Sequence, residues 1–209
     1  IPYADEILQS VDRLRFFQDD LSDCQGSLNI GVGESLLCYY LPPVLKEFHR
    51  RAPNARLFLR SMNCYDIRNE LLDGSWDLGV FYEDVGGFGS SLRVYSLAEW
   101  SLVLVACPEM KKLCPDFITP DREIPVPFII NEQNCIFRQI FEQYLREKSI
   151  CLDHTIELWS IPTIKNLAKN DTGISFLPVF TVKKELETGE LETIPTGLSD
   201  RTITAVCAH

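Results

Sequence analysis

The stretch that decides the fold is SLNIGVGESLLCYYLPPVLKEFHRRAPNARLFLRSM, residues 27–62. It opens with an apolar run over 27–33 that is typical of a buried strand. A helical pattern with one apolar face follows over 34–53 and stops before Pro53, and a second strand is predicted over 55–62. A strand, a helix and a strand in this order predict a parallel βαβ unit with a right-handed crossover.

The same alternation continues along the rest of the chain. Further strands are predicted at 76–82, 100–108, 127–133, 154–160, 173–180 and 201–209, and further helices at 65–75, 135–150 and 161–171. Each half carries a βαβ pattern, and no low-complexity linker separates the halves. We therefore expect an α/β fold of two similar lobes joined by extended crossover segments. Ligands of such sheets bind at the carboxyl ends of the strands, so a cleft is expected there.

The composition limits the classes of function. The chain has 209 residues, 45% of them hydrophobic, and a formal net charge of -10, with no run of Lys and Arg that would neutralise a row of phosphates. This part of the protein is not expected to bind nucleic acid. It has neither a long apolar run nor a secretory signal, which predicts a cytoplasmic protein with no membrane partner. The chain begins with Ile1 and ends with His209, and we expect native sequence beyond both ends.

The eight cysteines are scattered through apolar runs such as ESLLCYYLP and LVLVACPEM. A chain of this length can bury a sizeable core without disulfides, so reduced thiols are expected rather than a disulfide framework. No CxxC and no Cys/His spacing of a metal site occurs, and no metal or other cofactor is expected.

Residues 2–22 carry apolar side chains at Ala4, Ile7, Val11, Leu14 and Leu21, in steps of three and four if the intervening position, which is Gln18, is counted. This is the spacing of a coiled-coil seam, and an isolated helix of this length is marginal in water. We expect the helix to pair with a second copy or with a segment upstream of Ile1. The alternative is an amphipathic helix that lies on its own domain.

Two predicted strand-to-helix junctions carry matching chemistry. In the first half Gly33, Glu34 and Ser35 stand at a helix start, with Ser35 a candidate N-cap, and in the second half Ser160 stands two residues before Pro162. Helix starts offer unpaired amide donors to carboxylates, sulfates and phosphates, so a ligand pocket is one interpretation. The other is that both serines only cap their helices.

A third junction runs from Asn131 to Cys135, where a polar loop enters a helix. The helix dipole could lower the thiol pKa and make Cys135 reactive, or Cys135 could be an inert part of a pocket wall. Arg138 could meet an anionic ligand or pair with Glu142 one turn along, the commoner arrangement. No GxSxG, Walker A or HExxH motif is present, and no catalytic residue is assigned.

Several segments, taken in order, resemble one family: PYADEIL, IGVGES, LLDGSWDLGVFY, LVLVACP and SIPTIKNLAKNDTGISFLP. Together they are similar to the LysR-type transcriptional regulators, downstream of their DNA-binding domain. The resemblance implies a module like the type 2 periplasmic binding proteins, with two Rossmann-like lobes and two crossovers. It places the end of a linker helix at 1–22, lobe I at 26–99 and 204–209, and lobe II at 100–203.

By the same resemblance the chain would bind an inducer between its lobes and would not be an enzyme. The inducer would be small and could be anionic. The protein would self-associate as a dimer or tetramer, and DNA would be bound only by a winged helix-turn-helix domain upstream of Ile1. The implied pocket residues are Glu34, Ser35, Asn63, Cys64, Tyr82, Gln133, Asn134, Cys135, Ser160 and Ile161. Some members of the family carry Arg at the position of Tyr82, so this pocket is less suited to a dianion.

Three alternatives stay open at the level of sequence. Peroxide-sensing members carry a cysteine in a segment similar to EQNCIFRQ and a second one nine residues later, but here that position is Tyr144, and Cys151 lies beyond the helix. A redox role for Cys135 would need another partner. A solute-binding protein of a transport system would share the fold, and an enzyme such as a deaminase or dehydratase would need a catalytic set in the cleft.

Overall fold

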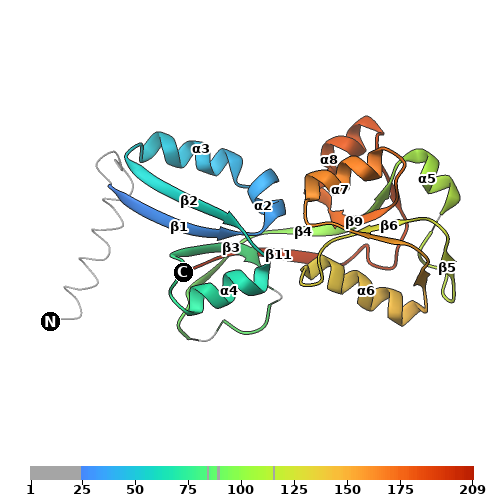
Figure 1. Ribbon diagram of the computed structural model, residues 1–209, viewed down its shortest axis with the longest axis horizontal. Helices are drawn as coiled ribbons and strands as arrows, with labels where there is room; N and C mark the ends of the chain where they lie inside the picture. The colour runs from blue at the N-terminus through green and yellow to red at the C-terminus, as the bar shows by residue number, and fades with distance from the viewer. Residues whose placement is uncertain (1–24, 84, 89, 115) are drawn as a thin grey trace.

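The computed structural model describes residues 25–209 except positions 84, 89 and 115. The linker helix expected at 1–22 lies outside the described residues. Within them the chain forms two α/β lobes, arranged along the long axis of the molecule and joined by long strands that run from one lobe to the other (Figure 1). The two-lobed α/β fold expected from the sequence is confirmed.

The first lobe has a parallel sheet in which β1 lies between β2 and β3. Its helices cover the sheet, and a helical segment connects each strand to the next, as a βαβ arrangement requires. The elements are β1 (Gly26–Val32), α2 (Glu34–Tyr39), α3 (Pro42–Arg51), β2 (Ala55–Ser61), α4 (Cys64–Leu72) and β3 (Leu78–Tyr82).

The second lobe contains two short parallel pairs, β6 with β8 and β5 with β7, besides strands of the large sheet. Its remaining elements are β4 (Val94–Ala106), α5 (Pro108–Leu113), β5 (Glu123–Ile124), β6 (Phe128–Ile130), α6 (Ile136–Lys148), β7 (Cys151–Leu152), β8 (Thr155–Glu157), α7 (Ile161–Lys169), β9 (Ser175–Pro178), α8 (Val179–Thr188), β10 (Glu192–Ile194) and β11 (Thr202–Ala208).

Strand β4 belongs to both lobes. Its first part, from Val94 to Ser101, pairs antiparallel with β11, and β11 pairs on its other edge with β3 of the first lobe. From Leu102 to Ala106 its partners are β9 and β10 of the second lobe. The expected start of this strand at Trp100 is wrong, because the part before it is largely exposed and lacks the continuous apolar run of a buried strand.

The single helix expected over 34–53 is also wrong, since the chain forms two helices there. Pro42 has no backbone N–H, and its ring would clash with the carbonyl of the preceding turn of a continuous helix. The proline stands instead in the first turn of α3, where the missing N–H has no intrahelical partner to lose. As a result α2 is only six residues long, and its start lies against the second lobe.

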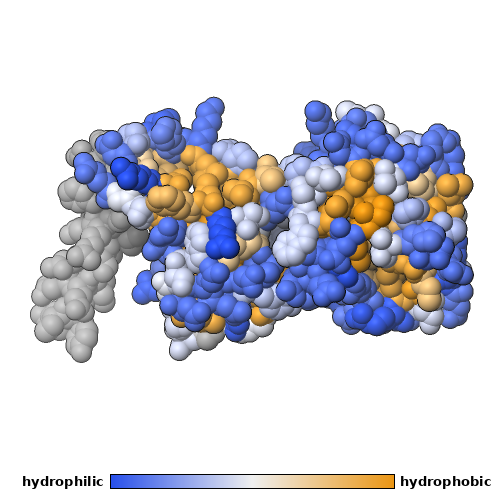
Figure 2. Space-filling model, in the orientation of Figure 1, coloured by the Kyte–Doolittle hydropathy of each residue, from blue (hydrophilic) through white to orange (hydrophobic). Residues whose placement is uncertain are grey.

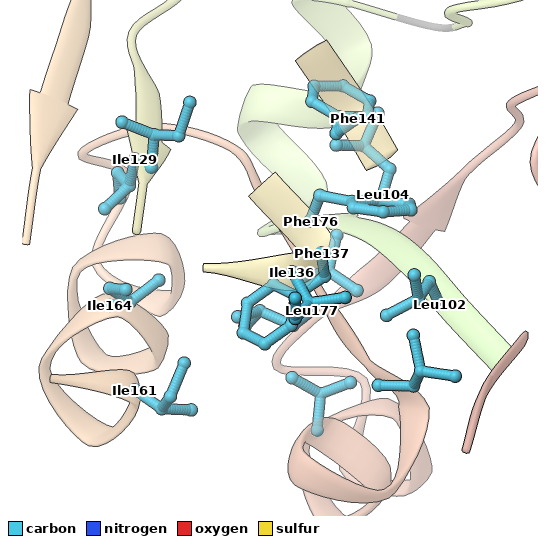
Figure 3. Packing of buried hydrophobic residues seen from close by; sticks show 14 of the residues in the cluster. Leu102, Leu104, Ile129, Ile136, Phe137, Phe141, Ile161, Ile164, Phe176 and Leu177 are labelled. Carbon is cyan, nitrogen blue, oxygen red and sulfur yellow. The ribbon is translucent and has the colours of Figure 1, made fainter. Parts of the chain in front are cut away.

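The core of the second lobe is built around Phe141 of α6. Its ring stacks on Phe128 and on Phe176 with centroid separations of 4.8 Å in both cases. Figure 3 shows Phe141, Phe176 and Leu104 gathered in this cluster, and Ile161 and Ile164 on a shared side of helix α7. Burial of these side chains fixes α6 and α7 against the strands, so the starts of both helices are held in place.

Candidate functional site

A cavity of about 100 Å³ lies where the two lobes meet. Both lobes supply its walls, from the starts of α2, α4 and α6 and from the residues around the start of α7. Among the residues predicted from the sequence, those that line it are Glu34, Ser35, Asn63, Cys64, Tyr82, Cys135 and Ile161. These side chains come together because each follows, or ends, a strand that points toward the junction of the lobes.

Three predicted residues do not line this cavity. Gln133 and Asn134 are exposed, because the chain makes a turn after β6 in which the Cys135 N–H donates to the Glu132 carbonyl. Ser160 is the N-cap of α7, and its Oγ accepts a hydrogen bond from the Thr163 N–H at 3.4 Å. For Ser160 the structure thus shows the capping role that was the alternative to a ligand contact.

The cavity also contains residues that the sequence prediction did not select. They are Gly33, Ser61, Met62, Asn131, Glu132, Ile136, Phe137 and Trp159. Two of them could have been selected from their place at a strand end, since Asn131 directly follows β6 and Ser61 ends β2. Residues at the carboxyl end of a parallel strand face the ligand crevice of such a fold.

The Ser35 hydroxyl faces the cavity wall rather than capping α2. The N-cap is Gly33, so the expected N-cap role of Ser35 is wrong, and its Oγ lies 2.6 Å from the Tyr82 hydroxyl in a buried hydrogen bond. Burial raises the pKa of Tyr82. The phenol therefore stays neutral and, with Ser35, forms a polar but uncharged part of the wall.

Glu34 reaches across the cavity to the start of α7. Its Oε2 accepts a hydrogen bond from the Ile161 N–H at 2.9 Å. The next residue, Pro162, has no N–H, and the N–H of Thr163 already donates to Ser160. The free amide donors expected at this helix start are thus engaged within the protein, and the carboxylate of Glu34 stands where an anion would bind.

Two further contacts join the lobes beside the cavity. The Tyr65 hydroxyl donates to Gln139 Oε1 at 2.9 Å, and Lys165 Nζ lies 4.5 Å from the centre of the Tyr39 ring. Lys165 is buried and also forms an ion pair with Glu185 at 3.0 Å. Glu34 at the start of α2 and Tyr39 at its end thus contact α7, and Tyr65 in the first turn of α4 contacts α6.

The cysteines of the cavity are poor candidates for thiolate chemistry. Cys135 is the N-cap of α6, yet burial raises its pKa well above that of a free thiol, with smaller contributions from its neighbours. Burial also raises the pKa of Cys64 to about 12. Because the thiolate is the reactive form, both residues are expected to be slow nucleophiles at neutral pH. The structure thus gives Cys135 the place of a wall residue.

Arg138 is engaged away from the cavity. Its guanidinium contacts Glu142 and Glu157 at 2.7 Å each and donates to the Asn131 carbonyl at 2.6 Å. The predicted pairing with Glu142 is confirmed. Glu132, by contrast, lines the cavity, and its carboxylate accepts from the Asn134 N–H. Burial raises the pKa of Glu132 despite that bond.

Over residues 25–209, apart from the three positions left out, no helix is long and apolar enough to cross a membrane. The same residues contain no group of three or more His, Cys, Asp or Glu side chains placed to hold a metal ion.

Comparison with known proteins gives a consistent family. The family model described as LysR substrate binding domain matches residues 23–209. The HTH-type transcriptional regulator YfiE of Escherichia coli K12 is 46% identical over 209 residues, which are 100% of this chain and 70% of that protein. The HTH-type regulator YwqM of Bacillus subtilis 168 is 27% identical over 193 residues, 92% of this chain and 65% of that protein.

Solved structures of low sequence identity share the fold. The regulatory domain of CcmR from Synechocystis PCC6803, solved in complex with 2-PG, has a TM-score of 0.72 at 22% identity and covers 88% of both chains. The bromide-bound regulatory domain of HypT from Salmonella typhimurium has a TM-score of 0.74 at 16% identity, over 89% of this chain and 86% of that one. The chain therefore belongs to the LysR family of transcriptional regulators, a non-enzymatic family, and forms its effector-binding domain.

Proposed function

We propose that the cavity between the lobes binds a small-molecule effector, and that its occupancy controls DNA binding and transcription through a winged helix-turn-helix region outside this chain. The observation that carries the proposal is the position of the cavity, at the strand ends of both lobes and between contacts that join them. A ligand there touches both lobes at once. It can therefore favour one arrangement of the lobes by as much as its affinity differs between them.

The organisation of the whole protein is part of the proposal. We assign lobe I to 26–99 and 204–209 and lobe II to 100–203, which is supported by the change of partners along β4 near Ser101. The proposed linker helix at 1–22 lies outside the described residues. The relatives YfiE and YwqM are longer than this chain, which leaves room in the native protein for the DNA-binding region. A DNA-binding regulator of this kind works in the cytoplasm.

Self-association as a dimer or tetramer is supported by exposed apolar side chains. Val44 of α3 and Phe58 of β2 are 52% and 54% exposed, and Figure 2 shows apolar residues gathered over this part of the first lobe. Exposed apolar patches commonly mark interaction surfaces.

An anionic effector, one expectation from the helix starts, would have to compete with Glu34. That carboxylate already accepts the hydrogen bond of the Ile161 N–H, which an anion at this helix start would need.

The test of the cavity uses Gly33→Leu as a filling variant. Gly33 lines the cavity, an added Cβ meets no atom closer than 3.9 Å, and φ is -63°, so a side chain has space there and causes no backbone strain. Thermal-shift screening of the chain with carboxylates, amino acids, sulfur compounds, amines and aromatic acids gives candidate effectors. We expect Gly33→Leu to weaken binding of the effector at least about tenfold, as a steric block in a pocket does.

The matched control is Gly87→Leu, because Gly87 has no atom within 4 Å of an added Cβ and does not line the cavity. The control should bind the effector like the wild type. A compound that stabilises both variants as much as the wild type would bind elsewhere, and this would contradict the proposed site. In the full-length regulator, Gly33→Leu should also abolish the effect of the compound on DNA binding.

A further inference from the structure

The charge of the cavity lining is entirely negative. Glu34 and Glu132 line it, whereas no Lys, Arg or His is among its lining residues in the described part of the chain. The remaining polar side chains, those of Ser35, Ser61, Asn63, Tyr82 and Asn131, are uncharged, as are the two thiols. A ligand that enters this cavity meets two carboxylates and no cationic side chain in the lining itself.

The nearest cationic side chains cannot supply that compensation without losing partners. Arg138 contacts two glutamates and a backbone carbonyl, and Lys165 is paired with Glu185 under the Tyr39 ring. An anionic ligand would also find the start of α7 closed, because Ile161 and Thr163 donate to Glu34 and Ser160. The amide of Asn63 is engaged as well, since its Nδ2 donates to Asp66 at 2.6 Å and its Oδ1 accepts from the Asp66 N–H at 2.9 Å.

Acceptors for a cation are present. In the hydrogen bonds of the described residues, Glu34 and Glu132 each use only Oε2. Asn131 is 6% exposed and lines the cavity, yet its side-chain amide takes part in no hydrogen bond with another described residue. The amide atoms of Asn131 are accessible from the cavity, so a ligand can take the place of water there. The Asn131 Oδ1 can accept from an ammonium group.

The rest of the lining suits a short apolar body. Ile136 and Phe137 are buried on one wall, and the Trp159 indole, 70% exposed, lines the cavity as well. Aromatic rings attract cations through the negative face of the π-system. A volume of about 100 Å³ is smaller than the roughly 150 Å³ that takes benzene, which limits the ligand to roughly five non-hydrogen atoms in this arrangement.

We propose that the effector is a small organic cation, a primary ammonium on a short apolar chain, with the ammonium bound by Glu34, Glu132 and the Asn131 oxygen. This rests on the proposed function and names the ligand class of the same cavity. The ammonium leaves the bond between Glu34 and Ile161 intact and uses the carboxylate's second oxygen, so binding strengthens the contact between the lobes. An effector carboxylate would break that contact.

The experiment compares three probes with four carbon atoms each on the 209-residue chain: n-butylammonium, 1-butanol and n-butyrate. Binding is followed by NMR chemical-shift changes of the cavity residues and by the fluorescence of Trp159. The Trp159 signal is obtained by subtracting the fluorescence of the Trp159→Phe variant, which retains Trp76 and Trp100. We expect butylammonium to bind at least about tenfold more tightly than either other probe, since a charged hydrogen bond is worth about this factor or more.

Glu34→Gln and Glu132→Gln should each weaken butylammonium binding about tenfold. Both substitutions keep the shape of the side chain and an acceptor oxygen, so the Ile161 and Asn134 N–H groups retain a partner. Glu187→Gln, an exposed position on α8, is the control and should bind butylammonium like the wild type. Circular dichroism confirms that each variant is folded before it is titrated.

The outcomes separate the two proposals. Tighter binding of butyrate or butanol than of butylammonium at the cavity resonances would overturn the cationic class and leave the ligand cavity in place. Butylammonium binding that ignores both glutamine variants would also overturn it. If none of the three probes perturbs the cavity residues at saturating concentration, the cationic class is contradicted. The screen with Gly33→Leu then tests separately whether the cavity binds an effector.

Discussion

Two of the carboxylates that contact helix α7 do so in opposite ways. Glu34 comes from the other lobe, lines the cavity and accepts from the backbone at the start of the helix. Glu185 comes from α8 of the same lobe, is 8% exposed and pairs with Lys165 in the middle of the helix. The first contact can exchange with a ligand or with water. The second is buried, and Glu185 Oε2 has no hydrogen-bond partner among the residues that the structure describes.

The difference indicates which contact stabilises the fold and which contact can change when a ligand binds. A buried charge that loses its partner is strongly unfavourable, so Lys165 and Glu185 must stay together whether the lobes are open or closed. A partly exposed carboxylate at a helix start contributes only a fraction of that free energy. The Glu34 contact can therefore form and break with the movement of the lobes.

The largest effect should come from breaking the buried pair. Lys165→Met should lower the free energy of unfolding by about 3 kcal/mol or more, because Glu185 is left charged and buried. Urea denaturation followed by circular dichroism measures it. The double variant Lys165→Met with Glu185→Leu should recover most of the loss. A single-variant loss no greater than that of a Glu34 variant would remove the distinction between the two carboxylates.

A middle-sized effect is expected from the hydrogen bond between Ser35 and Tyr82, which joins two residues of lobe I. Ser35→Ala should cost about 1–2 kcal/mol, since the buried Tyr82 hydroxyl loses its 2.6 Å partner. The same urea titrations on Ser35→Ala, Tyr82→Phe and the double variant form a thermodynamic cycle. If the losses in the free energy of unfolding are strictly additive, the two hydroxyls do not interact. The wall would then be less rigid than the geometry indicates.

The smallest change in stability belongs to Glu34. Glu34→Ala should lower the free energy of unfolding by about 0.5 kcal/mol, the usual contribution of a carboxylate at a helix start. The local effect is larger: amide hydrogen exchange at Ile161 should become faster, while Ile164, whose N–H donates to the Ser160 carbonyl at 2.9 Å, keeps its protection. Equal protection of Ile161 in both proteins would mean that the lobes are not joined there in solution.

Much of the fold could be predicted from the sequence, because buried strands and amphipathic helices alternate with clear periods. The exceptions have physical causes. The first part of β4 is exposed and lacks an apolar run, and Pro42 divides what the apolar spacing presents as one helix. The helix expected at 1–22 lies outside the described residues.

The site was predictable only in outline. Strand ends point to the residues at the junction of the lobes, and this rule brings Tyr82 and Cys135 to the cavity. It does not say which polar group takes which partner. The bond between Glu34 and Ile161 joins positions 127 residues apart, and it depends on how the lobes are set against each other. The expectation of free donors at the start of α7 was wrong for that reason.

The path of β11 has a consequence for the order of folding. This strand ends the chain, yet it fills the place between β3 and β4 in the large sheet. During synthesis the ribosome releases β1, β2 and β3 first, but one edge of β3 has no partner until residues 202–208 have been made. Such distant pairing is slow, and an open strand edge invites association with other chains. The lobe that is made first is therefore the one that is completed last.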